Sequence, residues 1–469
     1  MPTSSAVRHR SRPAIAIAAV VATAYLVGAC ANAARAQTPV RPAYGLPPVF
    51  ASGESLPARQ AVRPNSSERE HWPEKVLYAF NGPDGASPNP VIVGPHGVLY
   101  GTTYSGGAYL SQCYAVGCGT VFQLTPPPKG QSTWTETVLY SFTGGADGGY
   151  PSARLTLGAH GVLYGTTAGG GTGNFGTVFA LTPPLPGQTN WTESVLYSFT
   201  GGADGGYPSA ALTDLRGALY STASSFGSLG AGVAFRLGPP ARGQTTWTQT
   251  VIHTFGGTGD GAAPFAGFTL AGNALLSTTF GGGSCHPISF GCGTVYELTP
   301  KGAGDRQWRE TILFDFTGFD GLWPYYEPVL DASGALYVTA GGGGGGCGGL
   351  GCGTVVKLTP PLTRRRTWDS RVIFYNALTK SSPAEAVLTD DRGNLYGEGG
   401  GGPSGDGFIF ELSPHGGGLY KETILHRFSG ANGASPYGDW AIGPKGNIYG
   451  VTSVGGTACA CGVIYQLNP

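Results

Sequence analysis

The chain has 469 residues, among them 82 glycines and 36 prolines, and only 12% of its residues are charged. Glycine is poorly tolerated inside helices, so this abundance excludes a helix-rich protein. The glycines show no every-third-residue period, which excludes collagen, and a 41% hydrophobic content excludes a disordered chain. The formal net charge is zero, without a long basic run, which disfavours a nucleic-acid partner. A large, loop-rich, all-β protein remains.

The N-terminus carries basic residues, an apolar run over residues 14–29 and then small residues, the layout of a secretory signal. Two alternative cleavage sites for the signal peptide fit this region. Leu26 to Cys30 resembles a bacterial lipobox in which Cys30 becomes a lipid anchor, whereas Ala34 to Ala36 suits ordinary signal peptidase. We predict a signal peptide over 1–36, a flexible Pro/Ala-rich tether over 37–71 and a folded region over 72–469. The protein is then exported to the cell surface, the periplasm or the medium, and contacts a membrane only through the lipid anchor.

Apart from Cys30, eight cysteines fall into four close pairs. In an exported protein, such neighbours are expected to form local disulfides that close short glycine-rich loops. Zinc binding is the alternative, but the pairs lie far apart in the sequence and lack companion histidines, so we predict no metal. The pairs are Cys113 with Cys118, Cys285 with Cys292, Cys347 with Cys352, and Cys459 with Cys461. Only one residue separates the last two cysteines, which makes the geometry of that bond tight.

A tandem repeat organises the region from residue 72 onward. The segment WTETVLYSF at Trp134 recurs in seven copies, whose starts lie 52 to 62 residues apart. Its copies begin at Trp72, Trp134, Trp191, Trp247, Trp308, Trp368 and Tyr420. In most units the order is this segment, a DGxxP turn, an apolar stretch, LYGTT, a glycine-rich loop and GTVF.

Each unit therefore contains four short runs with strand composition, bounded by Gly and Pro. Four strands per unit in seven units predict an all-β, seven-bladed β-propeller. We expect the inner strand to follow the DGxxP turn and the WTETVLYSF strand to be the outermost strand of the preceding blade. The first strand, at residues 75–80, would then pair with the last, at residues 463–467, and close the ring.

The combination of LYGTT, a glycine-rich loop and GTVF over residues 72–469 resembles the Gloeo/Verruco tandem-repeat family. Units four and six depart from the pattern, with Leu275 and Leu276 in place of Leu-Tyr and Glu398 between the expected threonines. The resemblance implies an exported bacterial protein with a choice of anchor. It implies no established activity.

Residues that recur once per unit are interpreted as packing residues. They include the repeated Trp, the tyrosine of LYGTT, and His253 and His426, which occupy the position of Tyr140 and Tyr197. The DGxxP aspartates could bind calcium, but one carboxylate per blade is too few for a hard cation, so we interpret them as turn residues.

Residues that break the repeat just after the turn proline are the candidate ligand site. Small residues such as Ser209 and Ala210 recur there, whereas four units carry large or charged ones, with Arg154 in the second and Phe265 in the fourth. The predicted ligand-binding residues are Trp323, Tyr325, Tyr326, Glu327, Tyr437, Asp439 and Trp440. Aromatic platforms beside carboxylates suit the faces and hydroxyls of a sugar. The alternative is that these side chains only plug the channel.

Three functional classes follow. The first is a non-catalytic binding or surface-scaffold protein that takes a polysaccharide or cell-surface ligand without a cofactor. The second is a glycoside hydrolase or lyase with Glu327 and Asp439 as acid and base. The third is a purely structural component of a cell surface or biofilm. Neither a Gly-x-Ser-x-Gly elbow nor an HExxH motif is present, so the sequence favours binding or structure over catalysis.

Overall fold

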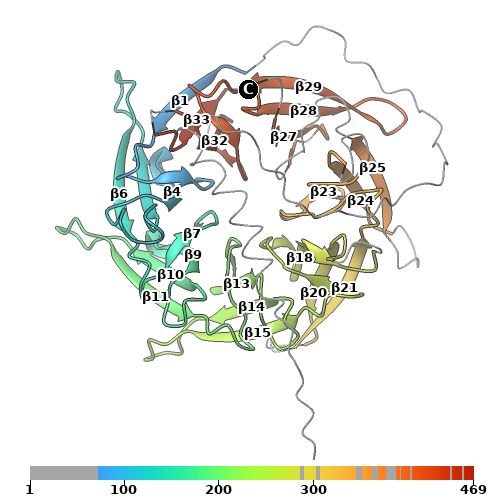
Figure 1. The fold of residues 1–469 in the computed structure, drawn as a ribbon, viewed down its shortest axis with the longest axis horizontal. Coiled ribbons are helices and arrows are strands. Elements are labelled where there is room, and N and C mark those ends of the chain that lie inside the picture. Colours follow the sequence, from blue (N-terminus) through green and yellow to red (C-terminus); the bar gives the residue numbers. More distant parts are fainter. Residues whose placement is uncertain are drawn as a thin grey trace, which may run out of the picture. The chain divides into compact units, whose positions relative to one another are not determined.

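The computed structural model describes residues 72–285, 290–302, 307–344, 351–361, 368–375, 387–390, 392–401, 404–443, 446–456 and 459–468. The predicted signal peptide, tether and Cys30 lie outside these residues. The described residues belong to one compact unit, Glu68–Pro469. Seven antiparallel sheets stand around a common axis and form a seven-bladed β-propeller (Figure 1). The predicted fold class is confirmed. Among the described residues, no helix is long and apolar enough to cross a membrane.

The first blade consists of β2 (Ala86–Pro88), β3 (Ile92–Val93), β4 (Leu99–Ser105), β5 (Thr120–Thr125) and β6 (Thr135–Ser141). The second consists of β7 (Gly149–Pro151), β8 (Thr156–Leu157), β9 (Leu163–Gly169), β10 (Thr177–Thr182) and β11 (Thr192–Ser198). The third consists of β12 (Thr213–Leu215), β13 (Ala218–Ala223), β14 (Val233–Gly238) and β15 (Thr248–Thr254). Two 3-10 turns, η1 (Pro95–Gly97) and η2 (Ala159–Gly161), follow the inner strands of the first two blades.

The fourth to seventh blades repeat this order. They consist of β17 (Thr269–Ala271), β18 (Ala274–Thr279), β20 (Thr294–Pro300) and β21 (Trp308–Asp315), with a ribbon of β16 (Gly261–Ala262) and β19 (Gly281–Gly282); of β22 (Val329–Leu330), β23 (Leu336–Ala340), β24 (Thr354–Thr359) and β25 (Asp369–Tyr375); of β26 (Leu388–Thr389), β27 (Leu395–Gly399), β28 (Phe408–Pro414) and β29 (Tyr420–Arg427); and of β30 (Ala434–Pro436), β31 (Ala441–Ile442), β32 (Ile448–Val454), β33 (Val463–Leu467) and β1 (Glu74–Ala79).

The two ends of the repeat close the ring. Strand β1 pairs antiparallel with β33, with Glu74 opposite Leu467 and Ala79 opposite Val463. The outermost strand of the seventh blade therefore comes from the start of the repeat region, as the sequence predicted. Leu77 and Phe80 from this segment are buried in a core shared with the first blade. Closure leaves neither end of the array with an exposed sheet edge.

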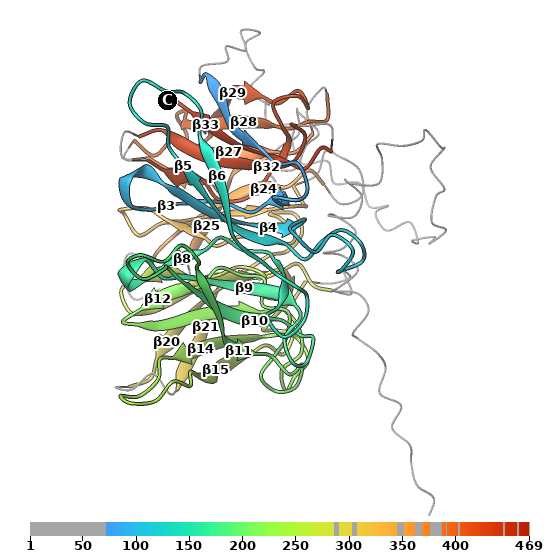
Figure 2. The ribbon, with the colours of Figure 1, turned by 90° about the vertical axis from the view of Figure 1, so that its left-hand side faces the viewer.

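The DGxxP turns and the glycine-rich loops lie on the same face of the ring, which we call the glycine-loop face. In successive blades the loop donates a backbone hydrogen bond to the turn, from Gly107 to Gly82 at 3.0 Å and from Gly171 to Gly145 at 2.8 Å. Figure 2 shows the propeller from the side, with the loop after β4 at one face and β3, β8 and β12 toward the other. The predicted placement of turns and loops is confirmed.

The motif glycines are required where neighbouring parts of the ring approach closely. Gly119, which begins GTVF, has φ +90°, and a Cβ there would lie 2.7 Å from Pro151 of the next blade. Gly101 in LYGTT makes room for the Phe122 ring, which would lie 2.5 Å from an added Cβ. In the described turns, the residue before the proline then donates its N–H to the preceding blade, as Tyr150 does to Cys118 at 2.9 Å. These contacts explain why GTVF and the DGxxP proline recur together.

The repeated aromatic residues pack between blades, as expected from their recurrence. Tyr100 of the first blade contacts Trp191 of the second edge to face, with ring centroids 6.1 Å apart. Tyr164 and Trp247 repeat this contact one blade further on, at 6.1 Å. Edge-to-face pairs of this kind add specificity to the burial of apolar surface that joins the blades.

Three predicted disulfides are present in the described residues. Cys113 bonds to Cys118, Cys285 to Cys292, and Cys459 to Cys461, with Cα atoms 5.3, 5.6 and 5.3 Å apart. The first two bonds close glycine-rich loops on the glycine-loop face. Cys352 is also disulfide-bonded, whereas its predicted partner, Cys347, lies outside the described residues.

Candidate functional site

A small cavity lies where the inner-strand segments of several blades converge at the channel mouth. Its volume is about 50 Å³, enough for a few water molecules. The residues that line it follow the turn prolines, as the sequence predicted for the candidate site. They are Pro90, Ser152, Ala153, Arg154, Ser209, Ala210, Ala211, Phe265, Ala266, Gly267, Tyr325, Tyr326, Glu327, Tyr437, Gly438 and Asp439.

Arg154 brings the two candidate carboxylates together. Its Nε lies 3.1 Å from Oδ2 of Asp439, and its Nη2 lies 3.9 Å from Oε1 of Glu327. These residues come from the second, seventh and fifth blades, and the Glu327 and Asp439 side chains are 14% and 27% exposed. Sequence reasoning singled out all three residues but not their mutual contact.

The charges around Arg154 do not cancel, because one guanidinium contacts two carboxylates. Burial and the nearby charge of Asp439 raise the pKa of Glu327, while Arg154 acts in the opposite direction. For Arg154, burial disfavours the cation, but the charges of Asp439 and Glu327 outweigh that effect and raise its pKa. The cluster therefore holds a fixed cation beside carboxyl oxygens that can accept hydrogen bonds.

An aromatic wall, which comprises Phe265, Phe280, Trp323, Tyr325 and Tyr326, stands beside this cluster. Phe265 stacks on Tyr325 with centroids 4.8 Å apart and an 11° interplanar angle. Phe280 stacks on Trp323 at 5.7 Å and 16°, and it meets Tyr325 edge to face at 6.0 Å. The wall therefore spans the fourth and fifth blades.

Trp323 brings a large ring to a position that the repeat holds in the left-handed region. Its φ of +59° is shared by the equivalent residues of other blades, which are Ser87, Tyr150, Tyr207, Ala263 and Ser435. Its indole Nε1 is buried and lacks a hydrogen-bond partner among the described residues. A tryptophan here thus adds a buried, unsatisfied donor to the aromatic wall.

Trp440 lies apart from this face. It is 9% exposed and belongs to a core between the sixth and seventh blades. Its Nε1 donates to Oε1 of Glu398, and the Tyr465 hydroxyl donates to the same oxygen at 2.6 Å. Trp440 is therefore held inside the wall of the ring, whereas Trp323 is half-buried against Phe280 and is not among the residues that line the cavity.

Glu398 is a buried residue to which the sequence assigned no role. It is 1% exposed, and burial raises its pKa to about 8, although hydrogen bonds from Tyr465 and Trp440 lower it. The signal for it was present, because Glu398 interrupts the threonine pair of the repeat. Its partner Trp440 also differs from the residue that the repeat usually has at its position. Two departures from the repeat therefore contact each other in the interior.

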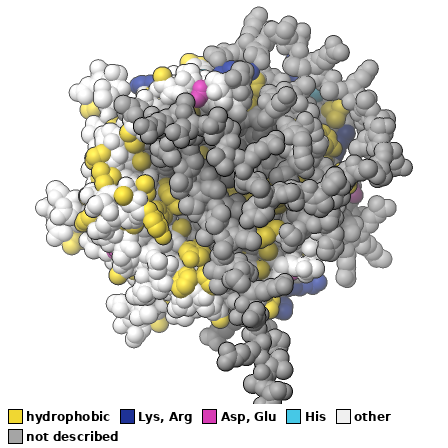
Figure 3. All heavy atoms as spheres, in the orientation of Figure 1, with side chains coloured by type: hydrophobic (Ala, Val, Ile, Leu, Met, Phe, Trp, Pro, Cys, Tyr) yellow, Lys and Arg dark blue, Asp and Glu magenta, His cyan; other side chains and the backbone are white. Residues whose placement is uncertain are grey.

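The two faces of the ring differ in their exposed aromatic residues. Those on the glycine-loop side are Tyr109, Tyr114, Phe290, Phe319 and Tyr375. On the opposite face, the large exposed apolar residues among those described are aliphatic, such as Leu185 and Leu419. Figure 3 views the glycine-loop face and shows hydrophobic side chains gathered there, with few charged groups where grey atoms do not cover it.

Comparison with protein-family models identifies the repeat. The Gloeobacter/Verrucomicrobia repeat model matches residues 70–290 and 284–469. The chain belongs to this family. A comparison with curated proteins finds no significant match.

Solved structures with similar folds include an ulvan lyase, described as a polysaccharide lyase bound to -[GlcA(1-4)Rha3S]-. It is 10% identical with a TM-score of 0.48, over 84% of this chain and 95% of that one. A glucose dehydrogenase is 14% identical with a TM-score of 0.37, over 85% and 99%. A luciferin-regenerating enzyme is 12% identical with a TM-score of 0.37, over 66% and 87%. At these identities, none of the three carries a conclusion about activity.

Proposed function

We propose that this repeat-family member is an exported, non-catalytic binding protein that recognises a carbohydrate over the channel mouth. The observation that carries the proposal is the convergence of Arg154, Glu327 and Asp439 beside the aromatic wall. Apolar sugar faces pack on aromatic rings, and sugar hydroxyls donate to carboxylates and accept from a guanidinium. The third blade carries the small residues Ser209, Ala210 and Ala211 at these positions.

The ligand would lie across the mouth rather than inside it. The cavity has room for only a few water molecules, while the aromatic wall and the exposed aromatic residues extend over the same face. Loops and side chains held by a rigid scaffold suit this use, because their positions are fixed before the ligand arrives.

Binding is favoured over glycoside cleavage by the contacts of the two carboxylates. A hydrolase needs one carboxyl group that is free to donate a proton and another that is free to attack or to activate water. Here Arg154 contacts both Glu327 and Asp439. The arrangement better suits hydroxyl recognition than proton transfer.

Export is part of the proposal. The basic and apolar N-terminal pattern suits a secretory signal, and disulfides form and persist in oxidising compartments. Anchoring through Cys30 or free release from the membrane remain the two routes. Incorporation of radiolabelled palmitate into the wild type, but not into Cys30→Ala, would support the lipid anchor, and the absence of label would support release.

A polysaccharide panel tests the ligand. We expect Trp323→Ala and Tyr326→Ala to weaken binding at least about tenfold, which corresponds to about 1.4 kcal/mol. Leu185→Ala is the matched control, since Leu185 is 67% exposed on the opposite face. Equal affinity of Trp323→Ala and wild type, or no binding to any polysaccharide, would refute the proposal. Turnover that Glu327→Gln abolishes would favour the hydrolase or lyase instead.

A further inference from the structure

The described blade junctions share three repeat positions. The first is the tyrosine of VLYSF on an outer strand, the second is the DGxxP aspartate after it, and the third is the glutamate of WTE on the next outer strand. In the described residues these sets are Tyr78, Asp84 and Glu136; Tyr140, Asp147 and Glu193; Tyr197, Asp204 and Gln249; His253, Asp260 and Glu310; Phe314, Asp320 and Ser370; and His426, Asn432 and Glu74.

At the regular junctions, the set is a structural hydrogen-bonding unit. The Tyr140 hydroxyl donates to Oδ2 of Asp147 at 3.0 Å, and Tyr197 does the same to Asp204 at 2.9 Å. A phenol has a single O–H, and at these junctions that O–H is already used in a hydrogen bond to the aspartate. Only the junction between the third and fourth blades combines His, Asp and Glu among the sets described.

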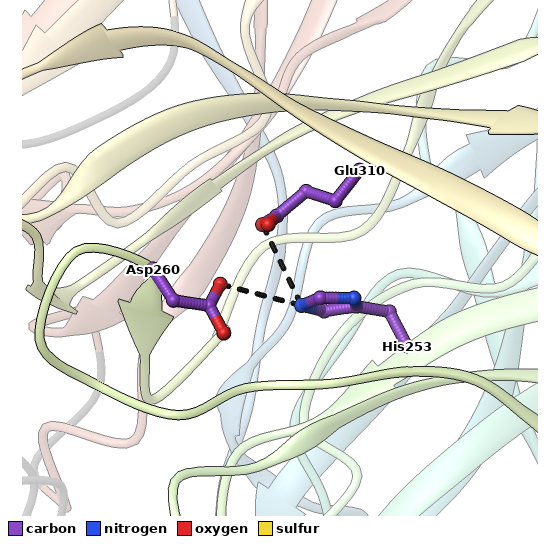
Figure 4. Close-up of side chains that lie close together, drawn as sticks. All are labelled: His253, Asp260 and Glu310. Carbon is purple, nitrogen blue, oxygen red and sulfur yellow. Dashed lines mark hydrogen bonds and ion pairs between the residues drawn. The ribbon is translucent and has the colours of Figure 1, made fainter.

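At that junction, one imidazole nitrogen faces two carboxylates. His253 Nε2 lies 3.3 Å from Oδ1 of Asp260 and 3.5 Å from Oε1 of Glu310, and ligand atoms of the three residues all lie within 4.8 Å of one another (Figure 4). The contact with Asp260 is a long hydrogen bond, and the contact with Glu310 is an ion-pair distance. Both distances also match ligand spacing, because bonds of about 2.0–2.2 Å in a tetrahedral site place ligand atoms roughly 3.3–3.6 Å apart.

Two of the three ligands, His253 and Asp260, are positioned by contacts with their neighbours. The His253 ring meets Phe255 edge to face at 4.6 Å, in the manner of Tyr197 on Phe199 at 5.1 Å. Backbone N–H groups of Gly256 and Gly261 donate to the Asp260 carboxylate at 2.7 and 2.8 Å. Such outer contacts orient ligands and leave further oxygen lone pairs free.

Charge and access also suit a cation. A neutral imidazole with two carboxylates carries two negative charges, which a divalent ion balances. The His253, Asp260 and Glu310 side chains are 19%, 22% and 16% exposed, so solvent reaches the set. An imidazole ligand favours Zn²⁺ and related transition ions over Ca²⁺ and Mg²⁺, which prefer oxygen alone.

We propose that His253, Asp260 and Glu310 bind a divalent transition-metal ion of the Zn²⁺ class, with solvent as the remaining ligand. The ion joins β15 to β21 and so cross-links the outer strands of the third and fourth blades. This proposal is independent of the carbohydrate site and departs from the sequence prediction of no metal. The competing account is that shared protons, rather than an ion, hold the two carboxylates beside His253.

The experiment titrates chelator-treated, purified full-length protein with ZnCl₂ and follows binding by calorimetry and the melting temperature. Co²⁺ provides a second probe, since four-coordinate Co²⁺ absorbs strongly in the visible range. The variants are His253→Tyr, which copies the tyrosine of the junctions at Tyr78, Tyr140 and Tyr197, and Glu310→Gln, which copies the natural Gln249. His426→Tyr is the matched control, because Asn432 replaces the aspartate at that junction.

We expect one Zn²⁺ per chain and a rise in melting temperature on binding. His253→Tyr and Glu310→Gln should weaken that binding by at least the roughly 10- to 100-fold that loss of an outer-shell partner costs, and His426→Tyr should not. Absence of Zn²⁺ binding to the wild type would overturn the proposal. So would unchanged binding by a folded His253→Tyr protein, since the ion would then occupy another place.

Discussion

The blade junctions and the channel mouth are built from the same repeat but use it in opposite ways. At the junctions, equivalent residues make equivalent contacts, as Tyr140 with Asp147 and Tyr197 with Asp204 show. At the mouth, equivalent positions carry Ala211 in one blade, Arg154 in another and Glu327 in a third. The junctions must fit identical neighbours, whereas the mouth faces solvent and a shared axis. Recurrence thus marks the scaffold, and divergence marks the surface available for function.

The largest effect should come from breaking ring closure. Deletion of residues 72–80 removes β1 and the buried Phe80, so β33 is left as an open sheet edge. We expect loss of the cooperative thermal transition and aggregation, measured by circular dichroism and light scattering. Phe80→Ala, which keeps the strand, should cost about 3–5 kcal/mol.

The control for that deletion is a variant that lacks residues 1–71 only. This variant keeps β1 and should melt like the full chain. A deletion of 72–80 with an unaltered melting curve would show that the junctions do not depend on closure, which would contradict the role given to the β1–β33 pair.

A smaller effect is expected at the channel mouth. Arg154→Ala leaves Glu327 and Asp439 near each other without a cation. Loss of one partner from a fully buried ion pair costs about 3–5 kcal/mol, but Arg154 is 38% exposed, so we expect about 1–2 kcal/mol in urea denaturation. The triple variant Arg154→Ala, Glu327→Gln, Asp439→Asn should recover most of that loss. Failure of the triple variant to recover stability would mean that Arg154 acts through packing.

The smallest effect is a pH dependence at the regular junctions. Burial and then the charges of Asp84 and Asp147 raise the pKa values of Glu136 and Glu193 from 4.5 to about 7. The folded state therefore binds these protons more tightly than the unfolded state. Their stabilising contribution is complete below about pH 4.5 and is lost as the pH rises through about 7.

The double variant Glu136→Gln, Glu193→Gln tests this, and the natural Gln249 at the equivalent junction indicates that it folds. Its melting temperature should match that of the wild type near pH 4 and exceed it above pH 7, by a margin reduced by solvent screening. A difference that is independent of pH would show that these glutamates do not titrate in this range.

The regular parts of the molecule were open to prediction from the sequence. Repeat number, strand order, ring closure and three disulfides followed from local signals, because each unit encodes its own turns and strands. Trp440 was harder, since its departure from the repeat resembles that of Trp323. The repeat position alone did not show that Glu398 and Tyr465 hold the indole inside the wall, because those partners lie 42 and 25 residues away.

The sequence by itself determined the architecture of this protein, because glycine, proline and aromatic signals recur at a spacing that only identical neighbouring blades satisfy. Only the tertiary structure decided which divergent residues meet. Closing seven blades into a ring brings Arg154 to Glu327 and Asp439 across the axis, and β21 brings Glu310 to His253 and Asp260. Contacts of this kind depend on the distances between blades, and those distances are set by the packing of the whole ring.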